Sequence, residues 1–329
     1  MLLLLLFALL FLNFSSGSVP LSWGEMWAAI GGSELGDATT AAHRFILLHH
    51  RLPQLVTAAL AGAALGSGGL VMQTLFRNPL ADPSLLGINA GASLGAALVL
   101  MLMGGVVSAG TFVLSGFVAS LLAAFVGAVA VLGLLLWAAS RVEGTAALLI
   151  VGVMLSFVVG SVVSLLHFAT AAEGLRAFLF WGMGDFSSLG LERLWWFVVA
   201  LLPAMLGLFL LVKPLDALLL GTDYAQTLGV DVRRARRWLL LAVGWLAAVV
   251  TAVCGPIAFL GLAAPHLARL YCRSSRHARL LPATLLIGAN LALLCLWLSQ
   301  STPLGQLPIN SLTPLIGAPI VVGGMVRKS

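Results

Sequence analysis

Apolar residues occur in long runs along this chain, and short polar stretches separate the runs. The runs occupy residues 2–14, 55–75, 85–103, 111–139, 145–168, 194–212, 238–252, 259–271, 281–299 and 309–326. At about 1.5 Å per residue, most can cross or nearly cross a hydrocarbon core about 30 Å thick. Residues 259–271 follow the Gly255-Pro256 break and predict a half-length helix. The pattern therefore predicts an all-α, polytopic membrane protein of about ten transmembrane helices, forming a single domain over residues 1–329.

The positions of the basic residues agree with this arrangement, because cytoplasmic loops of membrane proteins are enriched in Lys and Arg. With ten helices, one side of the membrane receives four basic residues: Arg44, Arg51, Arg176 and Arg193. The other side receives thirteen: Arg77, Arg141, Lys213, Arg233, Arg234, Arg236, Arg237, Arg269, Arg273, Arg276, Arg279, Arg327 and Lys328. We therefore expect the second side to be cytoplasmic, with both termini on it.

Composition and short motifs argue against several function classes. The chain is 61% hydrophobic and 9% charged, whereas soluble proteins carry about 25% charged residues. Neither lysine, Lys213 or Lys328, follows a glycine as a phosphate-binding loop requires. We therefore expect no catalytic site here, and any ATP hydrolysis to need a separate subunit. The basic residues lie between apolar runs, which does not indicate nucleic acid, and the scattered cysteines indicate no metal site.

An ion-coupled carrier working without an ATPase is the main alternative, and a membrane anchor without a transport pathway is another. Carriers of this kind usually keep ionisable residues near the midplane of the bilayer, because the coupling ion needs a ligand there. No Asp, Glu, Lys or Arg falls in the middle of a predicted run. The absence of such residues disfavours the ion-coupled carrier. Uptake driven by an ion gradient alone would show that the protein is such a carrier.

A polar turn separates the second and third runs. Asn78-Pro79 and Asp82-Pro83 lie within it, and a residue before proline is pushed out of the helical region. We expect one helix to end near Phe76 and the next to begin near Ser84. Glycines at four-residue spacing flank the turn and predict close helix packing: Gly62, Gly66, Gly87, Gly91 and Gly95. A tight turn between closely packed helices suits the inner end of a pore.

The longest connection on the basic side, residues 213–237, predicts two short helices. Pro214 stops the preceding helix, and Gly221 and Gly229 suit left-handed helix ends. Tyr224, Ala225 and Leu228 would share one face of the second short helix. That face is typical of a helix lying on the membrane surface or of a rigid knob inserted into a partner protein.

Five stretches of the chain, in order, resemble motifs of the FecCD-type permease family. They are RLPQ at 51–54, RNPLADPSLLGINAGASLG at 77–95, LGTDYAQTLGV at 220–230, GPIAFLGLAAPHLAR at 255–269 and LPINSLTPLIGAP at 307–319. Members of this family are the membrane subunits of type II ABC importers for iron-siderophores, haem and cobalamin. The resemblance implies that fold, in the bacterial inner membrane. It also implies a homodimer, two ATP-binding subunits that hold ATP and Mg²⁺, and a periplasmic substrate-binding protein, with no cofactor on this chain.

The resemblance further implies roles for individual residues. Coupling to the ATPase maps to a helix pair at about residues 214–231, with Gly221, Ala225, Leu228 and Gly229. The cytoplasmic gate maps to Asn78, Leu80 and Thr145, and docking of the binding protein maps to Arg51. Gln54 and Gln300 depart from the family, because relatives carry arginines there.

The sequence thus predicts the permease subunit of an ATP-driven importer. It would move an iron chelate (siderophore or haem) or cobalamin from periplasm to cytoplasm by alternating access. Iron complexes rank first only because the family handles them more often.

Overall fold

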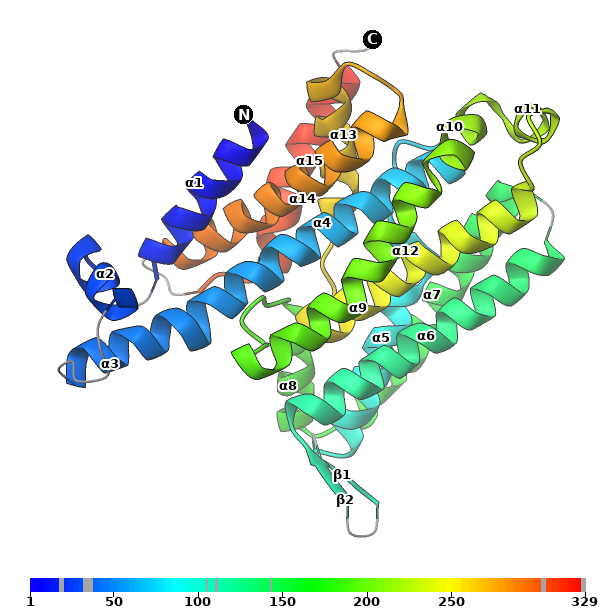
Figure 1. Ribbon diagram of the computed structural model, residues 1–329. Coiled ribbons are helices and arrows are strands. Elements are labelled where there is room, and N and C mark those ends of the chain that lie inside the picture. Colours follow the sequence, from blue (N-terminus) through cyan, green and yellow to red (C-terminus); the bar gives the residue numbers. More distant parts are fainter. Residues whose placement is uncertain are drawn as a thin grey trace.

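The computed structural model describes residues 1–17, 21–31, 38–104, 106–109, 112–142, 144–302 and 306–326. Within them the chain folds into a bundle of helices, with one small hairpin projecting from an end (Figure 1). Each predicted run has a helix as its counterpart: α1 (Leu2–Ser15), α4 (Leu52–Leu75), α5 (Ile88–Ala97), α6 (Phe117–Arg141), α7 (Thr145–Ala169), α9 (Leu191–Leu210), α12 (Val232–Cys254), α13 (Leu260–Cys272), α14 (His277–Gln300) and α15 (Ile309–Val326). The sequence located these helices because a long apolar run is a local signal.

The number of membrane crossings is not confirmed as ten. Six helical stretches of the described chain are long and apolar enough to cross a membrane: Thr39–Leu75, Phe117–Arg141, Ala146–Ala169, Leu191–Leu210, Val232–Cys254 and His277–Gln300. The apolar stretches Leu2–Ser15, Ile88–Leu102 and Ile309–Gly323 are shorter. The second of these consists of α5 and the π-helical turn η3 (Leu98–Leu102).

Two segments differ from the sequence prediction. The connector before the second run contains α2 (Trp23–Gly31), α3 (Ala38–Phe45) and the π-helix η1 (Ile46–Arg51), which leads directly into α4. A helix was expected from residue 111, but β1 (Val106–Ala109) and β2 (Phe112–Ser115) form an antiparallel hairpin there. The β-branched and aromatic residues of these strands favour an extended backbone. All other regular elements of the described chain are helices. One of them, α8 (Ala172–Gly182), has no counterpart among the predicted apolar runs.

Helix α4 lies at the centre of the bundle, and α7 and α9 lie at its outside. In α4, 20 of 24 residues are buried, and the helix packs against α9, α12, α13 and α14. In contrast, only 22% of the most apolar stretch of α7 and 28% of that of α9 are buried. Their exposed apolar surfaces are available to lipid or to another protein.

Glycines allow the closest helix contacts, as predicted. A Cβ atom on Gly62 would lie 2.2 Å from the Gly288 carbonyl oxygen of α14. One on Gly66 would lie 3.0 Å from the Cβ of Ala264, and one on Gly95 would lie 1.9 Å from the Ala123 carbonyl oxygen. These helices approach each other backbone to backbone, which only glycine permits at such distances.

Gly87 does not belong to this stripe, which corrects the prediction. The 3-10 helix η2 (Pro83–Leu86) follows the turn, and α5 begins only at Ile88. Gly87 lies between them with a φ of +77°, a backbone conformation that favours glycine. A Cβ there would lie 3.0 Å from the Gly152 carbonyl oxygen of α7. Gly87 therefore packs on α7, whereas Gly91 and Gly95 pack on α6.

Replacing Gly62 with Ala is expected to destabilise the protein. The new methyl group would overlap the Gly288 backbone, and α4 and α14 would have to separate. Overpacking of this kind costs about 1–3 kcal/mol. Thermal unfolding of the detergent-purified protein measures the effect. The control is Gly133→Ala in α6, where nothing lies within 4 Å of the new Cβ; equal midpoints for the two variants would contradict the packing argument.

Candidate functional site

The turn after α4, residues 77–82, is held in place by its own hydrogen bonds. The Oδ1 atom of Asn78 accepts a hydrogen bond of 2.9 Å from the Leu80 backbone N–H. The Asn78 carbonyl accepts a bond of 3.0 Å from the Ala81 N–H. Leu80 is 47% exposed, whereas Asn78 is half-buried. The turn therefore presents an apolar and a polar side chain from a defined backbone.

Asp82 anchors the end of this turn. Its Oδ1 atom accepts a hydrogen bond of 2.9 Å from the Ser84 N–H and caps η2. Burial raises the pKa of the Asp82 carboxyl, while its hydrogen bonds with Ser84 act in the opposite direction. The carboxylate packs against α13, since a Cβ on Gly261 would lie 2.4 Å from Asp82 Oδ2. The turn is therefore joined to the half-length helix as well as to α4.

Thr145, the third predicted gate residue, begins α7. Its side chain lies outside the described part of the structure. Gly144 precedes it with a φ of +91°, and its carbonyl accepts a hydrogen bond of 3.0 Å from Arg236 of α12. About two turns along α7, Gly152 packs against Leu85 of η2. Helix η2, which follows the 77–82 turn, is therefore packed against α7.

The predicted coupling segment consists of α10 (Val212–Leu220) and α11 (Thr222–Thr227). Gly221 separates the two helices with a φ of +125°, and Gly229 follows α11 with a φ of +79°. Both glycines lie where the sequence placed the helix ends. Tyr224 and Leu228 are 52% and 57% exposed, but Ala225 is fully buried. The expectation that these three share one face is therefore wrong: only Tyr224 and Leu228 are available to a partner.

The 77–82 turn and the α10–α11 segment touch each other. A Cβ on Gly221 would lie 2.6 Å from an Nη atom of Arg77, so the guanidinium packs on the Gly221 backbone. Arg77 begins the turn with a φ of +48°, which places it in the sparsely populated left-handed region. Two segments that lie far apart in the sequence thus meet at one point.

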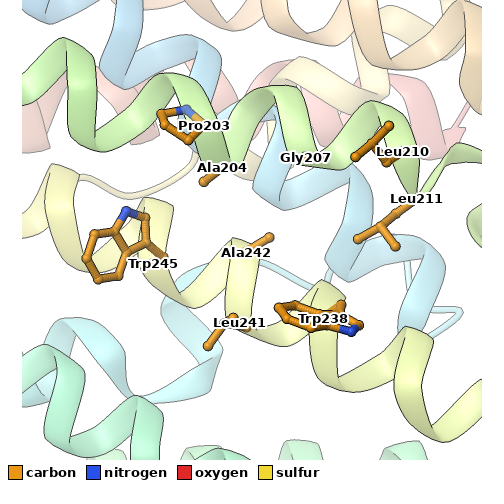
Figure 2. Close-up of a pocket in the computed structure, with 9 residues that line it drawn as sticks. All are labelled: Pro203, Ala204, Gly207, Leu210, Leu211, Trp238, Leu241, Ala242 and Trp245. Carbon is orange, nitrogen blue, oxygen red and sulfur yellow. The ribbon is translucent and has the colours of Figure 1, made fainter.

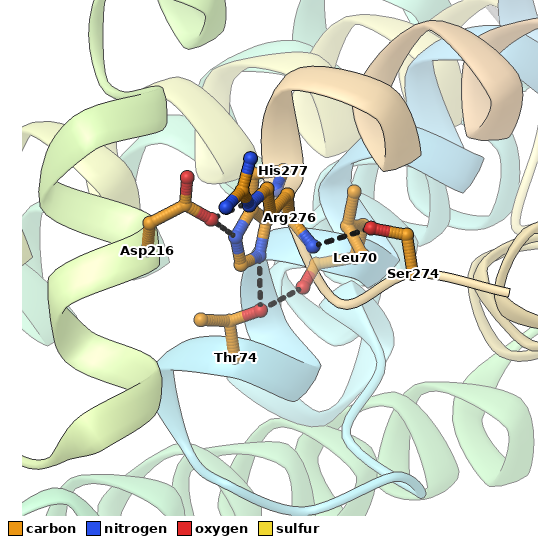
Figure 3. A network of polar contacts seen from close by, with 6 residues as sticks. All are labelled: Leu70, Thr74, Asp216, Ser274, Arg276 and His277. Carbon is orange, nitrogen blue, oxygen red and sulfur yellow. Dashed lines mark hydrogen bonds and ion pairs between the residues drawn. The ribbon is translucent and has the colours of Figure 1, made fainter. Parts of the chain in front are cut away.

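A buried histidine makes a second connection between these elements (Figure 3). His277, at the start of α14, is 1% exposed. Its Nδ1 lies 2.7 Å from Asp216 Oδ1, and its backbone N–H donates to the same oxygen at 2.8 Å. Its Nε2 lies 2.8 Å from the Oγ1 of Thr74. Since a carboxylate only accepts, Nδ1 carries a proton and donates it to Asp216. We call these three residues the Thr74–His277–Asp216 network.

This network joins three helices at one end of the bundle. Asp216 belongs to α10, His277 to α14, and Thr74 to the last turn of α4, just before the 77–82 turn. No sequence pattern indicated the network in advance. Asp216 and His277 are 61 residues apart, and neither residue belongs to a spacing pattern that indicates a site.

Arg51 is buried rather than presented at the surface. It is 6% exposed, its guanidinium donates to the Phe14 carbonyl, and it packs against Gly17. Docking of a binding protein by Arg51 stays a prediction, and this burial does not support it. Nearby, Gln300 donates a hydrogen bond of 2.9 Å to Gln54. The two glutamines are thus paired with each other and link α4 to α14.

Known proteins resemble this chain over almost its whole length. The FecCD transport family matches residues 4–327. The vitamin B12 import system permease protein BtuC of Klebsiella pneumoniae subsp. pneumoniae is 34% identical over 98% of this chain and 93% of its own length. BtuC of Salmonella paratyphi A is 33% identical over 93% of this chain and 90% of its own length.

A solved structure has the same fold. It is an inward-facing conformation of a metal-chelate type ABC transporter, with a TM-score of 0.84 and 29% identity. The match covers 100% of this chain and 98% of that one.

Proposed function

Because the chain belongs to the FecCD transport family, we propose that it is the membrane-spanning subunit of an ATP-driven importer that carries a metal chelate across the bacterial inner membrane. In this proposal two separate subunits bind ATP and Mg²⁺, and a periplasmic substrate-binding protein delivers the chelate. The permease works as a homodimer with both termini in the cytoplasm and binds no cofactor itself. The exposed apolar surface of α7 supports contact with a second copy.

One observation carries the proposal: the α10–α11 segment contacts the 77–82 turn directly. Arg77 packs on Gly221, and Asp216 of α10 binds His277, which in turn contacts Thr74 of α4. A displacement of α10 and α11 by a partner subunit would therefore act on the end of α4 and on the turn. These contacts support the assignment of α10–α11 to coupling and of Asn78, Leu80 and Thr145 to the gate.

The proposed mechanism is alternating access. ATP binding and hydrolysis in the partner subunits move the coupling segment, and the turn then opens or closes the cytoplasmic end of the pathway. A pathway lined by glycine, alanine, serine and apolar side chains, without fixed charges at the midplane, would hold a bulky ligand weakly. Selectivity would then come from the binding protein. A ligand shifts a conformational equilibrium only by its differential affinity for the two states, so ATP must bind more tightly in one of them.

For the substrate, we propose a metal chelate, with cobalamin as the first candidate. The similar permeases from Klebsiella and Salmonella are vitamin B12 import proteins, and the similar solved structure is a metal-chelate type transporter. This changes the order expected from the sequence, in which iron complexes came first. Ferric siderophores and haem remain the other candidates within the same class.

Uptake by proteoliposomes tests the proposal. The liposomes contain this permease with its ATP-binding subunit and binding protein, and receive labelled cobalamin, a ferric siderophore or haem. ATP-dependent accumulation of one compound is expected. Accumulation driven by an ion gradient without the ATP-binding subunit would overturn the ATP-driven mechanism. Accumulation of a siderophore or haem in place of cobalamin would keep the mechanism and replace the first candidate.

A further inference from the structure

An apolar groove runs between α9 and α12 on the outer surface of the bundle (Figure 2). Its volume is about 580 Å³, within the range of about 300–1,000 Å³ typical of small-molecule sites. The lining comes from both helices and the residue after α9: Pro203, Ala204, Gly207, Leu210, Leu211, Trp238, Leu241, Ala242 and Trp245. All of these lining residues are uncharged.

The groove opens on the outer surface of two candidate membrane spans. Leu210 is 84% exposed and Trp238 is 58% exposed, and both α9 and α12 are candidate membrane spans. Trp238 and Trp245 are seven residues apart on α12, so the groove extends about 10 Å along the helix axis. Trp245 closes the end beside Pro203, where its indole N–H donates to the Ala200 carbonyl at 2.8 Å.

Basic residues lie at the opposite end of the groove, beside Leu211 and Trp238. Lys213 is two residues beyond Leu211, and Arg237 is one helical turn before Leu241 on the same side of α12. Both side chains are exposed, and neither forms a salt bridge with any residue that the structure describes. Arg234, one turn before Trp238, pairs with Asp231 at 3.1 Å. The groove is therefore apolar along its length and cationic at one end.

We propose that this groove is a binding site for a phospholipid with an anionic headgroup. One acyl chain would lie between α9 and α12, and the phosphate would contact Lys213 and Arg237. A lipid tail gains little by leaving the bilayer for an equally apolar groove. The preference must therefore come from the headgroup, and basic residues at the membrane surface favour anionic lipids. With α10 and α11 on the cytoplasmic side, the lipid belongs to the cytoplasmic leaflet.

Tryptophan quenching in nanodiscs tests this site with the full-length protein. Brominated acyl chains quench a tryptophan that they contact, and Trp238 and Trp245 line the groove. Brominated phosphatidylglycerol is added to phosphatidylcholine nanodiscs and compared with brominated phosphatidylcholine. We expect half-maximal quenching at about a thirtyfold lower mole fraction of the anionic lipid, since each of the two basic residues contributes about 1 kcal/mol. A Trp238→Phe variant identifies the part of the quenching that comes from Trp238 in the groove.

Two variants locate the preference in the groove. Lys213→Gln with Arg237→Gln removes the cations and is expected to erase the difference between the two lipids; Arg176→Gln elsewhere on the chain is the control. Gly207→Phe fills the groove, since nothing lies within 4 Å of a Cβ at this position. Gly133→Phe in α6, with the same open surroundings, controls for adding a phenyl ring to a membrane helix.

Three outcomes would overturn the proposal. They are equal quenching by both lipids in the unmodified protein, an unchanged preference after removal of the cations, and no quenching of Trp238 by either lipid, as when a second copy covers the groove. If Gly207→Phe does not fold, the charge variants still decide. Uptake is not the readout, so failure here is distinguishable from failure of the proposed transport function.

Discussion

Replacing Leu228 with Asp is expected to lower ATP-driven uptake at least tenfold while the permease itself remains folded. Leu228 follows α11 and is 57% exposed, so Asp can be accommodated in the free protein at a cost within about 0.5 kcal/mol. In the assembled transporter the carboxylate would be buried against a partner subunit without a counter-charge. A few central side chains of an interface each contribute about 2 kcal/mol or more, and with Leu228 as one of them we expect uptake to fall at least tenfold.

Two neighbouring substitutions serve as controls for this experiment. Leu228→Met keeps the volume and the apolar character and is expected to retain uptake. Ala225→Asp is expected to lose uptake because the protein does not fold. Ala225 is fully buried, and a buried unpaired carboxylate prevents folding. Thermal unfolding separates this loss of fold from loss of coupling. Wild-type uptake by Leu228→Asp would contradict the coupling assignment.

Removal of the His277 ring is expected to lower both stability and coupling. His277→Ala leaves Asp216 and Thr74 without their ring partner and creates a cavity, which together cost about 2–4 kcal/mol. The variant also disconnects α10 from the last turn of α4, because the ring is the bridge between Asp216 and Thr74. We therefore expect fewer molecules transported for each ATP hydrolysed, in addition to a lower unfolding midpoint.

Two further variants, Asp216→Asn and Asp223→Ala, serve as comparisons for His277→Ala. In Asp216→Asn the new amide oxygen can still accept from the backbone N–H and from Nδ1 of His277, so a loss of about 1 kcal/mol is expected. Asp223 is exposed on α11, and its replacement should change stability by less than about 0.5 kcal/mol. The measurements are thermal unfolding, ATP hydrolysis and uptake of the reconstituted transporter. If His277→Ala transports the same number of molecules for each ATP hydrolysed as the unmodified protein, the Thr74–His277–Asp216 network has a structural role only.

The local features of this chain could be predicted without a structure. Each apolar run became a helix, because an apolar segment in a bilayer must satisfy its backbone hydrogen bonds internally. The prolines at 79 and 83 ended one helix and delayed the next, because their effect acts on the adjacent residue. Gly221 and Gly229 also have positive φ angles, which favour glycine, at the ends of the two short helices.

Other predictions failed where packing overrides the local pattern. Ala225 turned inward although Tyr224 and Leu228 remained exposed, since a helix as short as α11 takes its orientation from its neighbours rather than from its own periodicity. Gly87 takes a left-handed backbone conformation just before α5 and does not belong to the row of glycines on that helix. The packing that decided each case depends on residues outside the local pattern.

By itself, the sequence determined that this protein is a helical membrane permease, where its long apolar helices lie and where the 77–82 turn occurs. These features depend on composition, on short motifs and on the effect of proline on the adjacent residue. Only the tertiary structure decided that Arg77 meets Gly221, that His277 joins Asp216 to Thr74, and that a groove between α9 and α12 ends beside basic residues. Such contacts depend on how helices pack in three dimensions, and no local pattern of residues encodes them.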